Sequence, residues 1–194
     1  MTSEGQWVNS LVPRLNKELR QLARDGARLE IVSGRRLPYV HEVVAYSADG
    51  EAETHSMGYQ TDLLICDVGP DARWTPRVII ECKLGDVTTH DALTYSAKAA
   101  THKQVHPYLR YGFIIGGFGK ALPTRLLRHG AYFDFMMVWR TRKGTPTEWK
   151  TLLGVLQEEV RASRRLERIL TDRRHAKKQF SLFHRRLRLK GSGE

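Results

Sequence analysis

Two apolar runs separated by a turn constrain this chain most, because each run carries charged residues. Residues 61–68 read TDLLICDV and residues 77–84 read RVIIECKL. Gly69-Pro70-Asp71 follows the first run and favours a turn that folds one run back on the other. Charged side chains at the end of a buried strand cost free energy, so they indicate a paired or functional role.

The two runs are predicted to pair as antiparallel strands around a turn near residue 72. Residues two apart in a strand point to the same side, so Glu81 and Lys83 face one way and Cys82 the other. Asp62 then lies level with residues 81–83 and joins them if it is opposite Glu81 or Lys83. A register that places Asp62 opposite Cys82 would turn it away.

These three charged residues suit metal-assisted hydrolysis of a phosphodiester. Mg²⁺ binds one or two protein carboxylates together with waters and substrate phosphate, and makes bound water more acidic. Asp62 and Glu81 are the predicted ligands of Mg²⁺, with Mn²⁺ as the alternative ion. Lys83 is predicted to hold or deprotonate the water and to offset phosphate charge. A lowered pKa, expected for a lysine beside a metal ion, would suit a base.

Asp62 followed by Glu81-Cys82-Lys83 on the next strand, with a helix and another apolar strand after them, resembles the PD-(D/E)XK nuclease superfamily. The superfamily includes restriction endonucleases, repair and recombination nucleases and junction resolvases. The resemblance covers residues 6–118, and Thr61 replaces the family's proline. It implies an α/β fold with a restriction-endonuclease-like core, a central mixed β-sheet flanked by helices, and DNA as substrate. The competing interpretation is an ordinary surface hairpin with charged ends.

Within this class, an endonuclease of restriction or defence type is predicted. A small subunit that cuts both strands needs two active sites, so a homodimer is expected. The alternatives are a structure-specific repair or recombination nuclease and a non-catalytic nucleic-acid-binding module on the same fold. The net charge of +11 and the pI near 9.9 favour polyanionic partners. RNA is not excluded by the residues.

Other classes of protein lack their signals. No apolar run approaches the roughly 18 residues of a membrane span, and the N-terminus has no signal-peptide pattern, so a cytoplasmic protein is expected. Cys66 and Cys82 lie inside predicted strands and indicate buried thiols, not a disulfide or zinc site. No P-loop occurs. The run 116–119 lacks the spacing of a dinucleotide-binding loop and indicates a close backbone approach.

The expected order of elements is helix, three strands, helix, strand, as in the resembled core. In residue numbers, the predictions are a helix over 6–24, a strand over 37–46 with a turn at 48–50, a loop over 50–58, strands over 61–68 and 77–84, a helix from Thr88 or Thr89 to 105, and strands over 111–118 and 133–139. Residues 1–145 form the predicted nuclease-like domain.

Residues 146–194 are predicted to form a C-terminal helical basic extension, packed on the same domain. Thr145-Pro146-Thr147-Glu148 has the pattern of a capping box, and an apolar stripe follows to about Leu170. A dimer-forming helix is the alternative interpretation of the stripe. Residues 173–190 contain eight Lys or Arg and no acid. They indicate either a docked segment that presents arginine to phosphate or a disordered basic tail.

Further polar residues are weaker candidates for the site. Glu42 and Glu18 are candidates for an extra acidic site residue, and Asp67 competes with Asp62 as metal ligand. On the helix after the motif, Lys98 and His102 are four residues apart and share a face. The predicted nucleic-acid contacts are Lys98, His102, Lys103, Gln104, Arg173, Arg174, Lys177, Lys178, Arg185 and Arg186, with solvated surface as the alternative.

Overall fold

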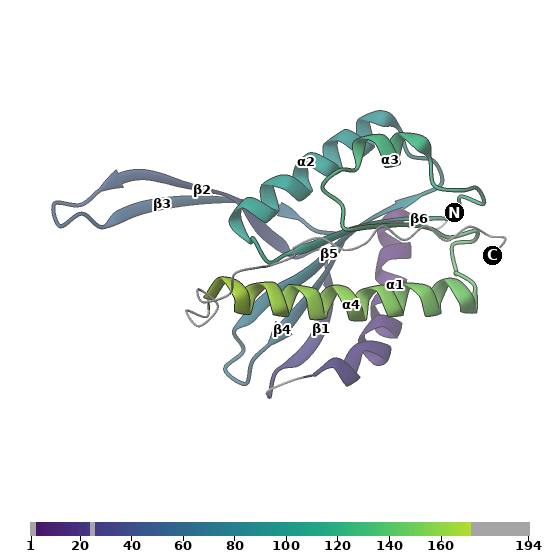
Figure 1. The fold of residues 1–194 in the computed structure, drawn as a ribbon, viewed down its shortest axis with the longest axis horizontal. Helices are drawn as coiled ribbons and strands as arrows, with labels where there is room; N and C mark the ends of the chain where they lie inside the picture. The colour runs from purple at the N-terminus through teal and green to yellow at the C-terminus, as the bar shows by residue number, and fades with distance from the viewer. Residues whose placement is uncertain (1–2, 24–25, 172–194) are drawn as a thin grey trace, which may run out of the picture.

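The fold is built around one five-stranded β-sheet with helices on both faces (Figure 1). The computed structural model describes residues 3–23 and 26–171. In chain order the elements are α1 (Glu4–Leu19), a 3₁₀ turn η1 (Arg20–Leu22), β1 (Arg28–Ser33), β2 (Arg36–Tyr46), β3 (Ala52–Gln60), β4 (Leu63–Val68), β5 (Trp74–Leu84), α2 (Thr89–Val105), β6 (Arg110–Gly116), α3 (Thr124–His129), β7 (Phe135–Val138) and α4 (Pro146–Thr171).

The central sheet is mixed and has the strand order β1-β4-β5-β6-β7. β4 pairs antiparallel with both β1 and β5, whereas β5–β6 and β6–β7 are parallel pairs. Helix α2 makes the connection between the parallel strands β5 and β6, as a parallel pair requires a crossover. The prediction of an α/β fold with a mixed sheet flanked by helices is confirmed.

The two faces of the sheet have separate apolar cores because alternate residues of each strand point to opposite sides. Helices α1 and α4 cover one face, where Trp7 and Trp149 pack with Ile80 and Cys82. On the other face, α2 packs over Ile79 and its neighbours. The apolar stripe of α4 lies in the first core, where Leu152, Leu156 and Val160 are buried.

Helix starts follow the capping signals in the sequence. Thr145 and Glu148 form the predicted capping box of α4: the Glu148 N–H donates to Thr145 Oγ1, and the Thr145 N–H donates to a Glu148 carboxylate oxygen. Thr88 caps α2 in the same way with Asp91. Both cysteines are buried free thiols, as predicted. In the described part of the chain, no helix is long and apolar enough to cross a membrane.

The region before β4 differs from the prediction. The strand predicted over 37–46 forms as β2, but it pairs with β3 in a separate two-stranded hairpin and not in the central sheet. The loop predicted over 50–58 is wrong, because this polar segment is strand β3, whose backbone hydrogen bonds are supplied by β2. β1, which was not predicted, occupies the edge of the sheet beside β4.

Candidate metal and phosphate site

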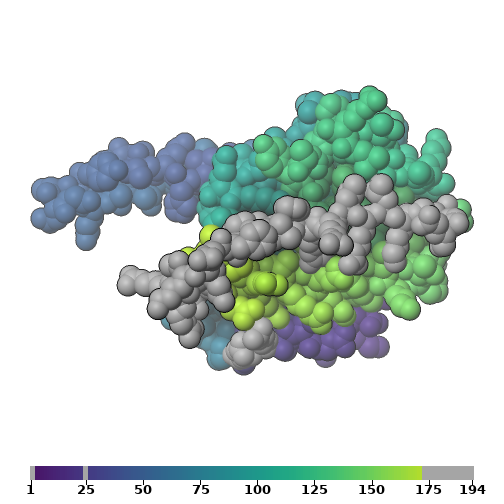
Figure 2. Space-filling view, viewed as in Figure 1, coloured from purple at the N-terminus to yellow at the C-terminus, as the bar shows by residue number. Residues whose placement is uncertain are grey.

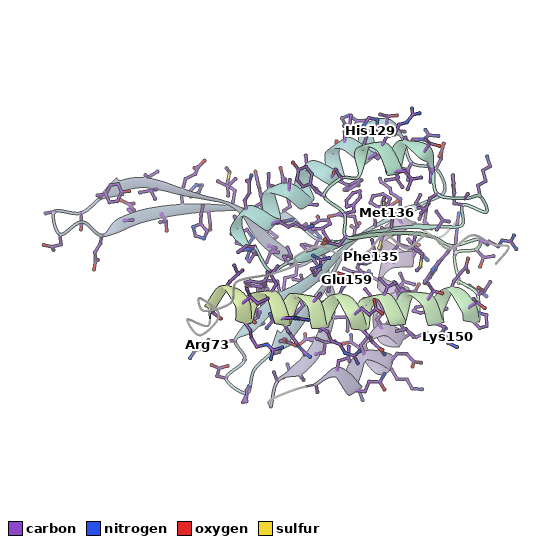
Figure 3. All side chains as sticks on the ribbon, viewed as in Figure 1. Arg73, His129, Phe135, Met136, Lys150 and Glu159 are labelled. Atoms are coloured by element: carbon purple, nitrogen blue, oxygen red, sulfur yellow. The ribbon has the colours of Figure 1, made fainter. Side chains whose placement is uncertain are left out.

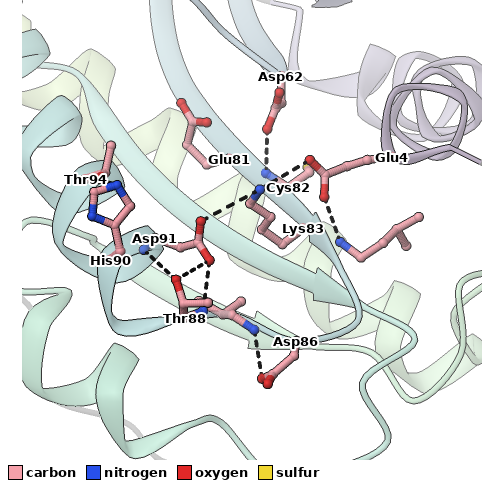
Figure 4. A network of polar contacts seen from close by, with 12 residues as sticks. Glu4, Asp62, Glu81, Cys82, Lys83, Asp86, Thr88, His90, Asp91 and Thr94 are labelled. Carbon is pink, nitrogen blue, oxygen red and sulfur yellow. Dashed lines mark hydrogen bonds and ion pairs between the residues drawn. The ribbon is translucent and has the colours of Figure 1, made fainter.

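Asp62 and Glu81 lie side by side at one end of the β4–β5 pair. Leu63 pairs with Ile80, so Asp62, one residue before β4, is level with Glu81. The Asp62 carboxylate accepts a hydrogen bond of 2.8 Å from the Cys82 N–H (Figure 4). By strand alternation both acids belong to the face of the sheet that α2 covers. The structure therefore has the register that the sequence hypothesis required.

The surroundings of this pair disfavour two negative charges. Burial, followed by the neighbouring Asp62 carboxylate, raises the pKa of Glu81 to about 7. Burial also raises the pKa of Asp62, although the hydrogen bond from Cys82 opposes this shift. Glu81 is only 2% exposed. A cation beside these oxygens would offset both costs.

Tyr111 and Lys98 contact the Glu81 carboxylate directly. The Tyr111 hydroxyl donates a hydrogen bond of 2.7 Å to Oε1, and Lys98 Nζ lies 3.9 Å from Oε2. The Lys98 ammonium also lies 5.1 Å from the ring centroids of both Tyr59 and Tyr95. Lys98 was predicted as a phosphate contact, and the structure places its charge against Glu81.

Lys83 extends from the same edge toward other acids. Its Nζ lies 3.6 Å from Glu4 Oε1 and 3.9 Å from Asp91 Oδ1 (Figure 4). Desolvation lowers the pKa of Lys83, but Tyr95 and these two carboxylates together raise it more, so the pKa lies above its ordinary value. Lys83 is therefore a cation in this arrangement, and the lowered pKa expected for a lysine beside a metal ion stays a prediction.

Glu4 is the acid that sequence reasoning missed. It lies in the first turn of α1, and its second carboxylate oxygen accepts a 3.0 Å hydrogen bond from the Leu84 N–H. Its charge contributes to the raised pKa of Asp62. An acid at a helix start is an ordinary capping signal, so the sequence alone did not distinguish it.

The two acids predicted as extra site residues lie elsewhere. Glu18 is exposed near the other end of α1, about 21 Å along the helix from Glu4. Glu42 lies in an exposed part of β2, with its carboxylate 3.7 Å from His55 Nδ1. Neither side chain has a contact to Asp62 or Glu81 among those found in the described residues. Both predictions are corrected. Pairing with β3 places Glu42 on the separate hairpin, and Glu18 lies at the end of α1 away from the site.

Asp67 is also not a metal-ligand candidate in the structure. Arg77 and Arg164 both donate hydrogen bonds to its carboxylate. Although burial alone would raise the pKa of Asp67, these two guanidinium groups hold it below its ordinary value. Asp67 therefore serves an internal ion-pair network at the other end of β4.

The helix residues predicted beside Lys98 have different environments. His102 is fully buried, donates from Nε2 to the Leu37 carbonyl oxygen at 3.2 Å, and has a pKa lowered to about 4 by burial. It is a neutral core residue, so its prediction as a phosphate contact is wrong. Lys103 donates to the Tyr132 carbonyl oxygen at 2.7 Å and pairs with Asp134 at 2.9 Å, which directs its charge into the protein.

The remaining predicted contacts stay predictions. Gln104 is exposed on α2. The basic residues of the C-terminal tail lie outside the described residues: Arg173, Arg174, Lys177, Lys178, Arg185 and Arg186.

The donor set at this edge fits a hard cation of the magnesium type. Within residues 3–23 and 26–171, no cluster of three or more His, Cys, Asp or Glu side chains is arranged to hold a metal ion. Mg²⁺ takes only one or two protein carboxylates when waters and phosphate complete its shell, and Asp62 and Glu81 offer that number. Burial raises the pKa of both carboxyls by disfavouring their charged forms, and a bound cation would stabilise those charged forms.

No protein-family model matches the chain, and no curated protein matches it.

Proposed function

We propose that this chain is a metal-dependent nuclease that hydrolyses DNA phosphodiester bonds on a restriction-endonuclease-like core. The observation that carries the proposal is the juxtaposition of Asp62 and Glu81 at the end of two paired strands, where burial raises the pKa of both. Perturbed carboxylates of this kind concentrate at functional sites, since folding alone does not favour them. The mixed sheet and the helix that follows β5 agree with the resembled core.

In this proposal each side chain has a defined task. Asp62 and Glu81 would hold Mg²⁺, or alternatively Mn²⁺, which when bound acidifies water and stabilises charge on the phosphate. Tyr111 holds one oxygen of Glu81 and leaves the other directed toward Lys98. Glu4 and Asp91 hold the Lys83 ammonium at the same end of the β4–β5 pair. Lys83 and Lys98 then supply positive charge for a phosphate group.

Within the nuclease class, we favour a DNA endonuclease of restriction or defence type that acts as a homodimer, because cleavage of both strands needs two sites. A structure-specific repair or recombination nuclease would use the same site. One observation favours a third candidate, a binding module that does not cut. Lys98 already neutralises part of the charge of Glu81, as a purely structural arrangement would require.

Cleavage assays on three DNA substrates test the proposal. Pure protein is incubated with plasmid, branched and single-stranded DNA, with Mg²⁺, with Mn²⁺ and with EDTA. We expect cleavage that needs the divalent ion. A preference for branched DNA over plasmid would assign the repair class, and DNA binding without cleavage under any of these conditions would assign the non-catalytic module.

Two variants then test the site itself. We expect Asp62→Asn and Lys83→Ala each to lower the cleavage rate about 10²-fold or more, with the fold and DNA affinity largely retained. Glu18→Gln is the matched control, since Glu18 is exposed about 21 Å along α1 from Glu4, and it should cleave like the wild type. Wild-type cleavage by Lys83→Ala would remove Lys83 from the mechanism.

A further inference from the structure

The β2–β3 hairpin extends away from the body of the molecule as an arm (Figures 1 and 2). Its base is anchored: Leu37 is buried in the core under α2, and Tyr39 and Tyr59 stack with ring centroids 3.7 Å apart. Beyond this base, every residue from 41 to 57 is exposed. We call residues 41–57 the arm.

The arm has features of a segment that binds another molecule. A two-stranded hairpin alone is marginally stable in water, and its open edges invite pairing or docking. Apolar side chains on the arm are largely exposed, with Val44 62% and Tyr46 69% accessible. Val43 and Met57 add to this apolar surface. Burying these side chains in an interface would be favourable, because apolar surface would be removed from water.

The charge of the arm argues against nucleic acid as its partner. The arm carries Glu42, Asp49, Glu51 and Glu53 and contains no Lys or Arg. A β-ribbon that enters a DNA groove needs cations to offset the phosphates, and these carboxylates would be repelled. The complementary surface is a basic protein, and the chain itself has a net charge of +11.

A basic surface lies at the end of the body from which the arm projects. Arg161, Arg165 and Arg168 are exposed and lie at i, i+4 and i+7 on α4, so they share one face of the helix. In Figure 1 the C-terminal end of α4 is at the left, below the base of the arm. Lys150, which Figure 3 labels, lies at the opposite end of the same helix.

We propose that the arm is a dimerisation element that docks on the α4 arginine face of a second copy of this chain. Because the arm and the arginine face lie at the same end, a two-fold axis at that end lets each copy contribute both surfaces. Such an interface is isologous, the usual arrangement in soluble dimers. The exposed valines and Tyr46 contribute apolar contact, and the carboxylates orient the arm on the arginines.

Charge reversal on full-length protein tests the inference by oligomeric state. Light scattering and sedimentation over a range of protein concentrations should give the mass of two chains. Glu51→Lys with Glu53→Lys should weaken the dimer about tenfold or more, as should Arg165→Glu with Arg168→Glu. Combining all four substitutions should restore the dimer, because opposite charges again face each other. The wild-type dimer should also weaken as salt is raised.

Matched controls separate this interface from a general charge effect. Glu18→Lys changes an exposed acid on α1, and Lys150→Glu changes a cation at the far end of α4; both should leave the dimer intact. A monomeric wild type at all concentrations would overturn the inference, as would a dimer unaffected by the arm substitutions. None of these readouts depends on cleavage, so the result stands whether or not the chain is a nuclease.

Discussion

At the scale of single residues, Glu81 shows how an unfavourable position can be held. Its carboxyl is almost fully buried and has a pKa of about 7, yet Tyr111 donates a hydrogen bond to one of its oxygens and the Lys98 ammonium lies 3.9 Å from the other. Strand alternation places the side chain on the face of the sheet that α2 covers, where Tyr111 and its neighbours form the core. The position therefore has a cost in stability that depends on pH.

This cost should be measurable as a difference in the pH dependence of unfolding. Below pH 4.5 Glu81 is protonated in both the folded and the unfolded chain. As pH rises toward 7, the unfolded chain loses the proton while the folded chain keeps it, so the free energy of unfolding falls. The loss is on the order of 3 kcal/mol at about 1.4 kcal/mol per pKa unit.

Glu81→Gln isolates this contribution. We expect the variant to be more stable than the wild type by about 1–3 kcal/mol at pH 8 and to lose that advantage near pH 4.5. Urea unfolding at several pH values measures the difference between the two proteins. The two proteins must be compared because buried His102 also makes stability depend on pH. Its pKa is lowered to about 4, so between pH 4 and 6.5 His102 makes the free energy of unfolding rise with pH, opposite to the effect of Glu81. Equal stability at both ends of the range would contradict the raised pKa.

At the scale of elements, close contacts decide how α1 meets the sheet. Gly116 ends β6, and a Cβ added there would lie 2.4 Å from Cζ2 of Trp7. Trp7 is held in place because its Nε1 donates to the Arg142 carbonyl oxygen and its ring meets Trp139 edge-on. The close backbone approach predicted for residues 116–119 is therefore the packing of Gly116 against the ring of Trp7.

Two glycine substitutions test this contact. Gly116→Ala should lower the free energy of unfolding by about 1–3 kcal/mol, because the tryptophan must shift in a filled core. Gly154→Ala is the matched control: apart from the adjoining residues of its own helix, no atom lies within 4 Å of its added Cβ, and Gly154 is inside α4. Alanine there should raise stability by about 0.5–1 kcal/mol, since it favours the helix. Chemical denaturation measures both, and a neutral Gly116→Ala would show that Trp7 can move freely.

At the scale of the whole molecule, charge is unevenly distributed along the chain. The arm is acidic, whereas residues 173–190 hold eight Lys or Arg and no acid. The first segment suits a basic protein surface and the second suits phosphate. Under the proposed function, the tail increases DNA affinity without reading sequence.

Deleting residues 173–194 should weaken DNA binding and flatten its dependence on salt. Each lost phosphate contact should lower the slope of log affinity against log salt by about 0.9. Fluorescence anisotropy with one labelled duplex at several salt concentrations measures the slope. Deletion of residues 191–194 alone removes no Lys or Arg and serves as the control. A slope unchanged by the longer deletion would show that the tail makes no phosphate contact.

The sequence by itself determined those features that depend on neighbours along the chain. The turn after β4 placed Asp62 level with residues 81–83, although the exact register was left to the structure, and capping residues marked the starts of α2 and α4. Such signals act within a few residues, so a single sequence contains them in full. The polar strand β3 had no such signal, because its stability comes from pairing with β2.

Only the tertiary structure decided which distant residues complete the site. Two of these residues reach the C-terminal end of β5 because helices pack on both faces of the sheet. They are Glu4, from the first turn of α1, and Lys98, from α2. The same packing buries His102, although its spacing from Lys98 predicts a shared exposed face. Spacing in a helix tells which residues share a side, but only the burial of that side decides between core and surface.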